Sequence, residues 1–192
     1  MDVDRNRFTE SQPLEYSQGY LLERAVQSSI NSIVIIDALV SGRPLVYANA
    51  AFYRTTGYHP TEVLGKSLHF LQGFDSDPAA VNSIIHALEH HQELKTSILN
   101  YRKDGTSYWN EVHISPVLDA TNKVTHFIGV LLDISDKRAI EEQLIYNQTH
   151  DPLTGCLNRS HLEERVTHDL VLAKRQRQML ALYYIDLDKF KA

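Results

Sequence analysis

The pattern of apolar and polar positions along the chain predicts five strands in two groups. β-Branched or alternating segments occur at residues 32–37, 45–48, 93–101, 106–118 and 123–134. Runs of this kind, bounded by turn residues, are typical of strands. Asp104-Gly105 is a hairpin signal between the third and the fourth segment. We therefore predict an α+β fold in which a five-stranded antiparallel sheet carries short helices on one face.

Helical periodicity fills the stretch between the two groups of strands and a short segment before them. We expect helices at residues 20–27, 50–56, 60–65 and 77–91. The last is the clearest, because its apolar residues form one stripe at helical spacing: Val81, Ile84, Ile85 and Leu88. His86 and His90 lie off this stripe, four residues apart, and could bind a metal or a haem. A solvated polar face is the favoured interpretation, because no third ligand is within reach by sequence.

The hairpin also predicts which side chains meet. If Asp104-Gly105 is the centre of the turn, Asn100 and Asn110 face each other on the mostly apolar side of the two strands. Buried carboxamides need partners for their N–H donors and their carbonyl acceptors. Two alternatives stay open here. The asparagines bond to each other, to backbone or to water, or they bind a planar heteroaromatic ligand that lies against the sheet.

The two ends of the chain are expected to lack a core of their own. Residues 1–19 have the polar composition of a flexible arm. Residues 136–150 form a weakly apolar helix, and a helix at 160–178 precedes an apolar strand at 180–185. About forty residues with one helix and one strand cannot close a core unaided. We therefore expect the residues after about 150 to be disordered, partly helical or docked on a neighbour.

Composition and charge restrict the class of protein. The 192 residues are 43% hydrophobic and 22% charged, with a net charge of −5, which is the mixture of a soluble globular protein. The acidic balance argues against nucleic acid as a partner, and no apolar run approaches the roughly 18 residues that span a membrane. Cys156 is the only cysteine. That excludes an internal disulfide and a cysteine-built zinc site, and favours a reducing, cytoplasmic setting.

Several motifs together resemble a PAS domain over residues 20–135. They are Asn49-Ala50-Ala51-Phe52, Thr56-Gly57-Tyr58, Glu62-Val63-Leu64-Gly65, Asn100-Tyr101-Arg102-Lys103-Asp104-Gly105, Trp109-Asn110, Gly129-Val130 and Asp133-Ile134-Ser135. Phe70-Leu71-Gln72-Gly73 further resembles the light-oxygen-voltage (LOV) branch, whose members hold flavin mononucleotide (FMN). The resemblance implies a PAS fold with Asn100 and Asn110 against the flavin ring and Gln72 near the ribityl chain. Asn49, from the first motif, is included in the candidate ligand pocket.

Four positions depart from the LOV pattern. Leu68 stands where the photoactive branch has a cysteine that attacks the excited flavin, and Leu131 stands where it has a glutamine that changes its hydrogen bond. His69 replaces one arginine that pairs with the flavin phosphate, and the second would fall near Ile85. A phosphate without guanidinium partners is poorly held. The resemblance therefore implies a domain without LOV photochemistry, whose small-molecule ligand is a flavin (FMN or riboflavin), another apolar ring, or absent. Haem is disfavoured because His86 lies on the wrong side of its helix.

Residues 151–192 resemble the beginning of a GGDEF domain, the catalytic unit of diguanylate cyclases. Asp151-Pro152-Leu153-Thr154-Gly155 matches its opening, and Asp186 begins a stretch similar to its first metal motif, where this carboxylate would bind magnesium. The sequence lacks the Gly-Gly-Asp/Glu-Glu-Phe motif and the second metal carboxylate. We therefore predict an incomplete α/β fragment without catalysis, since two-metal phosphoryl transfer needs carboxylates from two places. Magnesium and GTP would be bound only in a longer parent protein.

Together these features predict a sensory module that controls a cyclic-di-GMP signalling output. Its expected parts are a flexible arm (1–19), a PAS domain (20–135), a helical signalling linker (136–150) and the truncated start of a GGDEF domain (151–192). We expect a homodimer through the PAS domain and linker helices, because the last strand of the sheet is apolar on both faces. An intramolecular cover of that strand is the alternative. Two other functions stay open: a flavin-binding redox sensor, and an active diguanylate cyclase in a longer parent.

Overall fold

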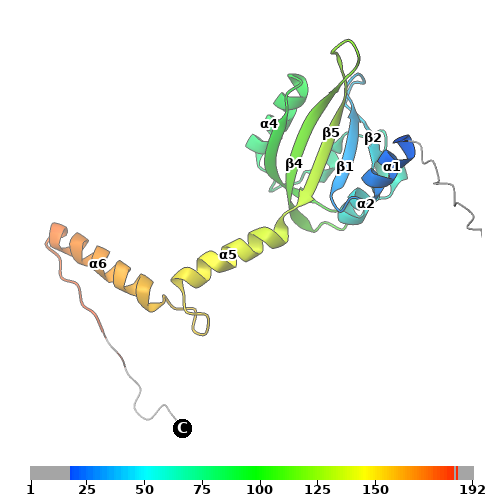
Figure 1. Ribbon diagram of the computed structural model, residues 1–192. Helices are drawn as coiled ribbons and strands as arrows, with labels where there is room; N and C mark the ends of the chain where they lie inside the picture. Colours follow the sequence, from blue (N-terminus) through cyan, green and yellow to red (C-terminus); the bar gives the residue numbers. More distant parts are fainter. Residues whose placement is uncertain (1–17, 184, 186–192) are drawn as a thin grey trace, which may run out of the picture. The chain divides into compact units, whose positions relative to one another are not determined.

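A computed structural model describes residues 18–183 and residue 185, which divide into two compact units (Figure 1). The first unit ends at Ser135 and the second begins at Asp136. No helix in the described part of the chain is long and apolar enough to cross a membrane.

The first unit contains the expected five-stranded antiparallel sheet, with strand order β2-β1-β5-β4-β3. The strands are β1 (Ser32–Asp37), β2 (Leu45–Ala48), β3 (Leu94–Tyr101), β4 (Ser107–Leu118) and β5 (Val124–Asp133). The last strand in sequence pairs with the first, so β5 lies at the centre of the sheet (Figure 1). The α+β prediction is confirmed.

Helices precede the sheet and connect its two groups of strands. They are α1 (Gln18–Ser28), α2 (Ala50–Thr56), α3 (Pro60–Val63), the 3₁₀ turn η1 (Leu68–Leu71) and α4 (Pro78–Glu89). Local chemistry fixes several of their ends. The Asp77 side chain accepts a hydrogen bond from the backbone N–H of Ala79 at the start of α4, directly before Pro78 at the first helical position. Gly57 ends α2 in the left-handed conformation, with φ 76°.

The connecting helices share one hydrophobic core with the inward face of the sheet. Phe52 of α2 and Phe127 of β5 are fully buried there, with Val34 of β1 and Ile98 of β3. Gly129 of β5 lies opposite Val34 in the register. A Cβ at this glycine would approach Val34 Cγ2 to 2.7 Å. The close packing of β1 on β5 therefore requires glycine at this position.

The pairing of β3 with β4 differs from the expected one by two residues. Asn100 lies opposite Tyr108, and Asn110 lies opposite Ile98. The reason is the loop, which is centred on Asp104 and holds Gly105 at φ 85°. The backbone N–H of Arg102 donates to Thr106 O across it, at 2.8 Å. A three-residue loop with glycine at its left-handed end is a standard hairpin connection. The shift by an even number of residues leaves both asparagines on the predicted face.

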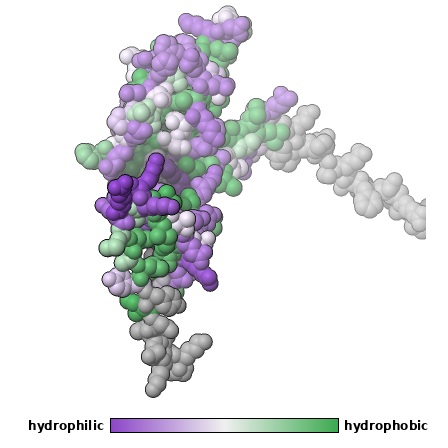
Figure 2. Space-filling model, turned by 90° about the vertical axis from the view of Figure 1, so that its left-hand side faces the viewer, coloured by the Kyte–Doolittle hydropathy of each residue, from purple (hydrophilic) through white to green (hydrophobic). Residues whose placement is uncertain are grey.

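The second unit consists of α5 (Ser135–Thr149, which begins on the last residue of the first unit) and α6 (Arg159–Gln176), joined by a hydrogen-bonded loop. Asn158 closes this loop: its Oδ1 accepts from His161 N at 2.9 Å and its Nδ2 donates to Gln148 O at 2.7 Å. Neither helix has a buried residue. Beyond α6, the side chains of Met179 and Tyr183 are exposed. Figure 2 shows green, hydrophobic groups among purple, hydrophilic ones on the face that it presents.

Two predictions about the ends of the chain need correction. Gln18 and Gly19 belong to α1 and not to an arm, and the rest of the predicted arm lies outside the described residues. The expected strand at 180–185 does not form in its described part, residues 180–183 and 185. A strand needs a neighbouring strand for its backbone hydrogen bonds, and the described second unit offers none. Asp186, the predicted magnesium ligand, lies outside the described residues.

Candidate functional site

A cavity of about 230 Å³ lies between the inward face of the sheet and the segment from η1 to α4. Most of its lining is aliphatic, with polar side chains at a few points. Its lining includes Arg43, Ser67, Leu68, His69, Gln72, Ile85, Asn100, Asn110, Gly129 and Leu131. An apolar cavity with a few convergent polar groups is the usual form of a small-molecule site.

Asn100 and Asn110 form the polar part of the sheet side of this cavity. Both are buried, and Asn110 Nδ2 donates to Asn100 Oδ1 at 2.8 Å. Among the described residues, Asn110 Oδ1 has no hydrogen-bond partner. Asn100 Nδ2 makes one long contact of 3.4 Å, to Leu99 O. The asparagines thus bond to each other, as one of the two alternatives expected, but this leaves an acceptor and most of a donor unused. An unpaired buried polar group costs about 1–3 kcal/mol.

Gln72 and His69 contribute polar groups from the opposite wall. His69 lies in η1, and Gln72 follows the last residue of that turn. The ring nitrogen His69 Nδ1 lies 3.3 Å from Gln72 Oε1. This contact occupies the carbonyl of Gln72 and leaves its NH₂ group available to the cavity.

The positions at which the sequence departs from the LOV pattern lie in this same cavity. Leu68, Ile85 and Leu131 present aliphatic side chains to it, and His69 is the polar member of the set. The lining contains no cysteine. The single thiol, Cys156, is exposed in the loop between α5 and α6 of the second unit.

Asn49 is not a cavity residue, so its place in the predicted pocket was wrong. Its Oδ1 accepts from Phe52 N at 3.1 Å, which caps α2, and from Ile33 N at 3.0 Å. Its Nδ2 donates to Val26 O at 3.0 Å and to Asn31 O at 2.9 Å. Every polar atom of the fully buried carboxamide is therefore used. Asn49 connects α1, β1 and α2.

Arg43 is a lining residue that the sequence prediction missed. It follows Gly42 in the turn between β1 and β2, and the sequence pattern marked residues 41–44 only as a turn. Ser67, directly before η1, was missed for the same reason. Neither position belongs to a motif, and no local pattern in the sequence marks either of them as a cavity residue.

A second unpredicted feature connects the hairpin to the beginning of α5. Arg102 Nη2 forms an ion pair with Asp133 Oδ2 at 2.6 Å, and Nε donates to Thr55 O at 2.9 Å. Its guanidinium lies 4.5 Å from the ring centre of Tyr108. Burial raises the pKa of Tyr108 well above its ordinary value, against the opposing effect of Arg102.

The same connection reaches the cavity through β4. Ser135, the first residue of α5, accepts a hydrogen bond on Oγ from Trp109 N at 2.9 Å. Trp109 O in turn accepts from Ile134 N at 2.9 Å. The start of α5 is thereby bonded to the residue next to Asn110.

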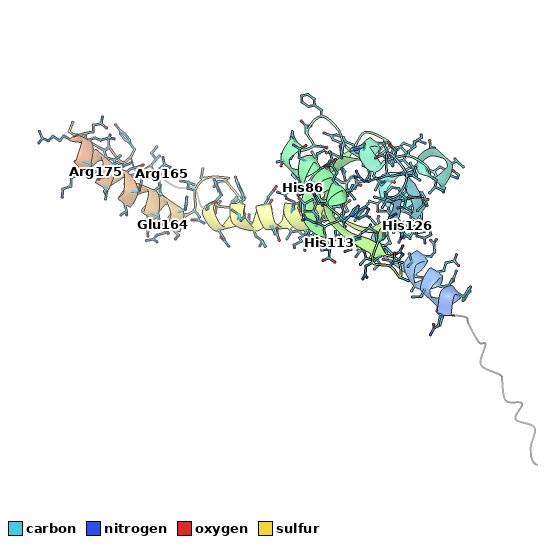
Figure 3. The ribbon with its side chains drawn as sticks, turned by 90° about the horizontal axis from the view of Figure 1, so that it is seen from above. His86, His113, His126, Glu164, Arg165 and Arg175 are labelled. Carbon is cyan, nitrogen blue, oxygen red and sulfur yellow. The ribbon has the colours of Figure 1, made fainter. Side chains whose placement is uncertain are left out.

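The histidines do not form a metal centre within the described residues, where no group of three or more candidate ligands occurs. His86 and His90 are exposed on α4, with ring centres 4.1 Å apart. Figure 3 shows His86, His113 and His126 on separate elements of the first unit. The predicted solvated polar face of α4 is confirmed.

Comparisons with known proteins agree with this geometry. The family model described as a PAS domain matches residues 31–136, and that described as "Diguanylate cyclase, GGDEF domain" matches residues 148–192. A blue-light-activated histidine kinase of Brucella canis is 38% identical over 111 residues, which are 58% of this chain and 23% of the kinase. Phototropin-2 of Oryza sativa subsp. japonica is 40% identical over 114 residues, 59% of this chain and 13% of the phototropin. The chain thus spans less than a quarter of the length of either relative.

Solved structures show the same similarity. An RNA-binding light-oxygen-voltage receptor matches with a TM-score of 0.62 and 37% identity, over 75% of this chain and 40% of that one. The LOV domain of the Erythrobacter litoralis blue-light-activated histidine kinase matches with a TM-score of 0.53 and 36% identity, over 55% of this chain and 96% of that one.

Proposed function

Because the chain belongs to the PAS domain family, we propose that its first unit is a sensor that binds a flavin-type ring and regulates a cyclic-di-GMP signalling output. A LOV-like PAS domain followed by a GGDEF fragment is an arrangement for regulatory signalling. Three properties are proposed for this chain: its ligand, its lack of LOV photochemistry and its signalling output.

The unpaired acceptor on Asn110 carries the proposal of a ring ligand. An imide edge, as in the pyrimidine part of a flavin, offers an N–H between two carbonyls. Its N–H can donate to Asn110 Oδ1, and one of its carbonyls can accept from Asn100 Nδ2. The NH₂ group of Gln72, on the opposite wall, is available to the ribityl chain. The residues present thus fit the group, since the unused polar atoms of Asn100 and Asn110 meet partners and the aliphatic lining covers the rest of the ring.

We further propose that the bound ring does not form a bond to the protein when illuminated. Covalent attack on a flavin needs a thiol at the ring, and Leu68 presents a hydrocarbon side chain to the cavity instead. Leu131 likewise lacks a side-chain amide that could change its hydrogen bonds. A flavin supplies one- and two-electron chemistry when bound. The residues that can register its occupancy or redox state are Asn100, Asn110 and Gln72, which supports the redox sensor as the second candidate.

The output is proposed to pass through α5. Asp133 and Ser135 tie the first turn of this helix to the hairpin. Beyond that turn the apolar residues of α5 are all exposed: Ile140 by 62%, Leu144 by 57% and Ile145 by 64%. Ile128 and Leu132 are exposed on the outer face of β5. A second copy of the chain would cover such surfaces, which supports the proposed homodimer.

Catalysis is not proposed for these 192 residues. Only residues 148–192 match the GGDEF family, and the Gly-Gly-Asp/Glu-Glu-Phe motif does not occur in the sequence. In a complete domain Asp186 would contribute a carboxylate to magnesium, and GTP would be the substrate. A direct check is incubation of the chain with GTP and Mg²⁺, for which we expect no cyclic-di-GMP.

Titration with riboflavin tests the ligand. We expect the native chain to quench flavin fluorescence saturably. Asn110→Leu should weaken binding at least tenfold, since one hydrogen bond of this kind contributes about 1.4 kcal/mol or more in a dry site. Asn82→Leu, on the exposed face of α4, is the matched control and should bind as the native chain does. Equal binding by the native chain and Asn110→Leu would contradict the proposal.

A further inference from the structure

The lining of the cavity includes Arg43 in the loop between β1 and β2, Ser67 at the end of the loop between α3 and η1, and His69 in η1. Two backbone hydrogen bonds hold these loops together: Leu45 N donates to Lys66 O, and Gly65 N donates to Leu45 O, both at 2.9 Å. The β1–β2 turn is therefore fixed beside the segment that leads into η1. The lining residues Arg43 and Ser67 therefore lie close in sequence to backbone groups that are hydrogen-bonded to each other.

The Arg43 guanidinium has no hydrogen bond or ion pair to any of the described residues. It is nevertheless half-buried. Arg102 shows the contrast, because it is also half-buried and its donors reach Asp133, Thr55, Thr106 and Ser107. Arginines that lose contact with water normally acquire such partners. Arg43 thus has unused donors at a ligand cavity.

The carboxylate nearest to Arg43 in sequence is committed elsewhere. Asp37 Oδ1 accepts from Leu39 N at 2.7 Å and from Val40 N at 3.3 Å, which shapes the β1–β2 connection. Glu62, on α3 close to Ser67 in sequence, is paired with Lys103 Nζ at 2.6 Å. The positive charge of Arg43 is therefore not neutralised by either group.

The backbone of Arg43 has a left-handed conformation, which is unfavourable for an arginine. Its φ is 47°, directly after Gly42 at φ 83°. Residues other than glycine rarely adopt this left-handed backbone conformation, because their Cβ atom causes steric strain there. The turn itself therefore does not require an arginine at this position.

We propose that the ring bound in this cavity carries an anionic group, and that Arg43 is its charge partner. This inference rests on the proposed ring site and specifies the ligand class as a phosphorylated flavin rather than a neutral one. Ile85 on α4 offers a phosphate no charge, and His69 offers a ring nitrogen already shared with Gln72. A planar guanidinium from the β1–β2 turn supplies the two-pronged donor set that phosphate prefers. The charge partner of the anion would thus come from the β1–β2 turn and not from α4.

Parallel titrations with FMN and riboflavin test this assignment, because the two ligands differ only in the phosphate. The native chain is expected to bind FMN at least tenfold more tightly than riboflavin. Arg43→Gln should weaken FMN binding about tenfold or more and leave riboflavin binding within about twofold. Added salt should reduce FMN affinity in the native chain more steeply than in Arg43→Gln.

The control is Lys66→Gln, which removes the same charge from the exposed residue next to Ser67 and outside the cavity lining. It should retain the preference of the native chain for FMN. If Arg43→Gln binds both flavins as the native chain does, or if Lys66→Gln reproduces its effect, the assignment of Arg43 is overturned while the ring site stands. If the native chain binds neither flavin, both proposals are overturned.

Discussion

The two units of this chain differ in how their apolar residues are used. In the first unit, side chains from the sheet and from four connecting elements share one core, with Phe52 and Phe127 completely buried. In the second, neither α5 nor α6 buries a single residue. Helices are stabilised mainly by packing of an apolar face. The comparison therefore shows which part carries its own stability and which part depends on a neighbour.

Limited proteolysis should show the largest difference. We expect cleavage within residues 136–183 at least 100-fold faster than cleavage within 32–133, because exposed helices open at little cost whereas the core opens only on global unfolding. Mass analysis of fragments over time measures both rates. Equal resistance of the two regions would mean that the second unit is covered in solution, and a digest at several protein concentrations would show whether a second copy covers it.

Truncation of an apolar side chain should lower the free energy of unfolding far more in the core of the first unit than in the second unit. Phe52→Ala is expected to lower the free energy of unfolding of the first unit by about 3–5 kcal/mol. Leu144→Ala, on the exposed face of α5, should change it by less than about 0.5 kcal/mol. Urea unfolding followed by the fluorescence of Trp109, in β4, reports on the first unit. A loss above 2 kcal/mol for Leu144→Ala would show that α5 packs on the first unit, against this account.

Within the first unit, removal of the asparagine pair should abolish ligand binding and have little effect on stability. Replacing both Asn100 and Asn110 by leucine removes the unpaired acceptor together with its partner, which is close to neutral for folding. We expect the free energy of unfolding to stay within about 1 kcal/mol of the native value while flavin binding is lost. A double variant that unfolds much more easily would show that these carboxamides stabilise the fold rather than bind a ligand.

The smallest expected effect is on the stability of the two units at acidic pH. The hydrogen bond from Lys103 lowers the pKa of Glu62 in the first unit, and the Thr154 backbone N–H lowers the pKa of Asp151 in the second. When the pKa of a carboxyl group is lower in the folded state than in the unfolded state, the group stabilises the fold at any pH above its ordinary pKa. This stabilisation is lost as the pH falls toward the pKa of the folded state. Glu62→Gln should therefore flatten the acid side of the stability profile of the first unit slightly. Asp151→Asn should leave that profile unchanged.

The sequence predicted most of this architecture because its signals are local. The limits of β1, β2 and α2 follow from β-branched runs, an N-capping Asn49 and a terminating Gly57. The register of β3 against β4 was missed by two residues, because it depends on the length of the hairpin loop. That length is decided by the left-handed conformation of Gly105, which no periodicity reveals.

The candidate site was predicted only where motifs mark it. Asn100, Asn110, Gln72, Leu68 and Leu131 do line one cavity, but Asn49 was misplaced because its motif lies next to the cavity in sequence and caps a helix in space. Arg43 was missed because its position follows from two backbone hydrogen bonds between loops far apart in the chain. A prediction from local pattern has no access to such pairings.

Flavin absorption under blue light decides whether this cavity supports a light-driven bond. The native chain is loaded with FMN and compared with Leu68→Cys loaded in the same way. We expect the blue absorption band of the native complex to show no reversible loss of the kind that a sulfur–flavin bond produces. Leu68→Cys, which places a thiol in the cavity lining, should show that loss and recover in the dark. A reversible adduct in the unaltered chain would contradict the account.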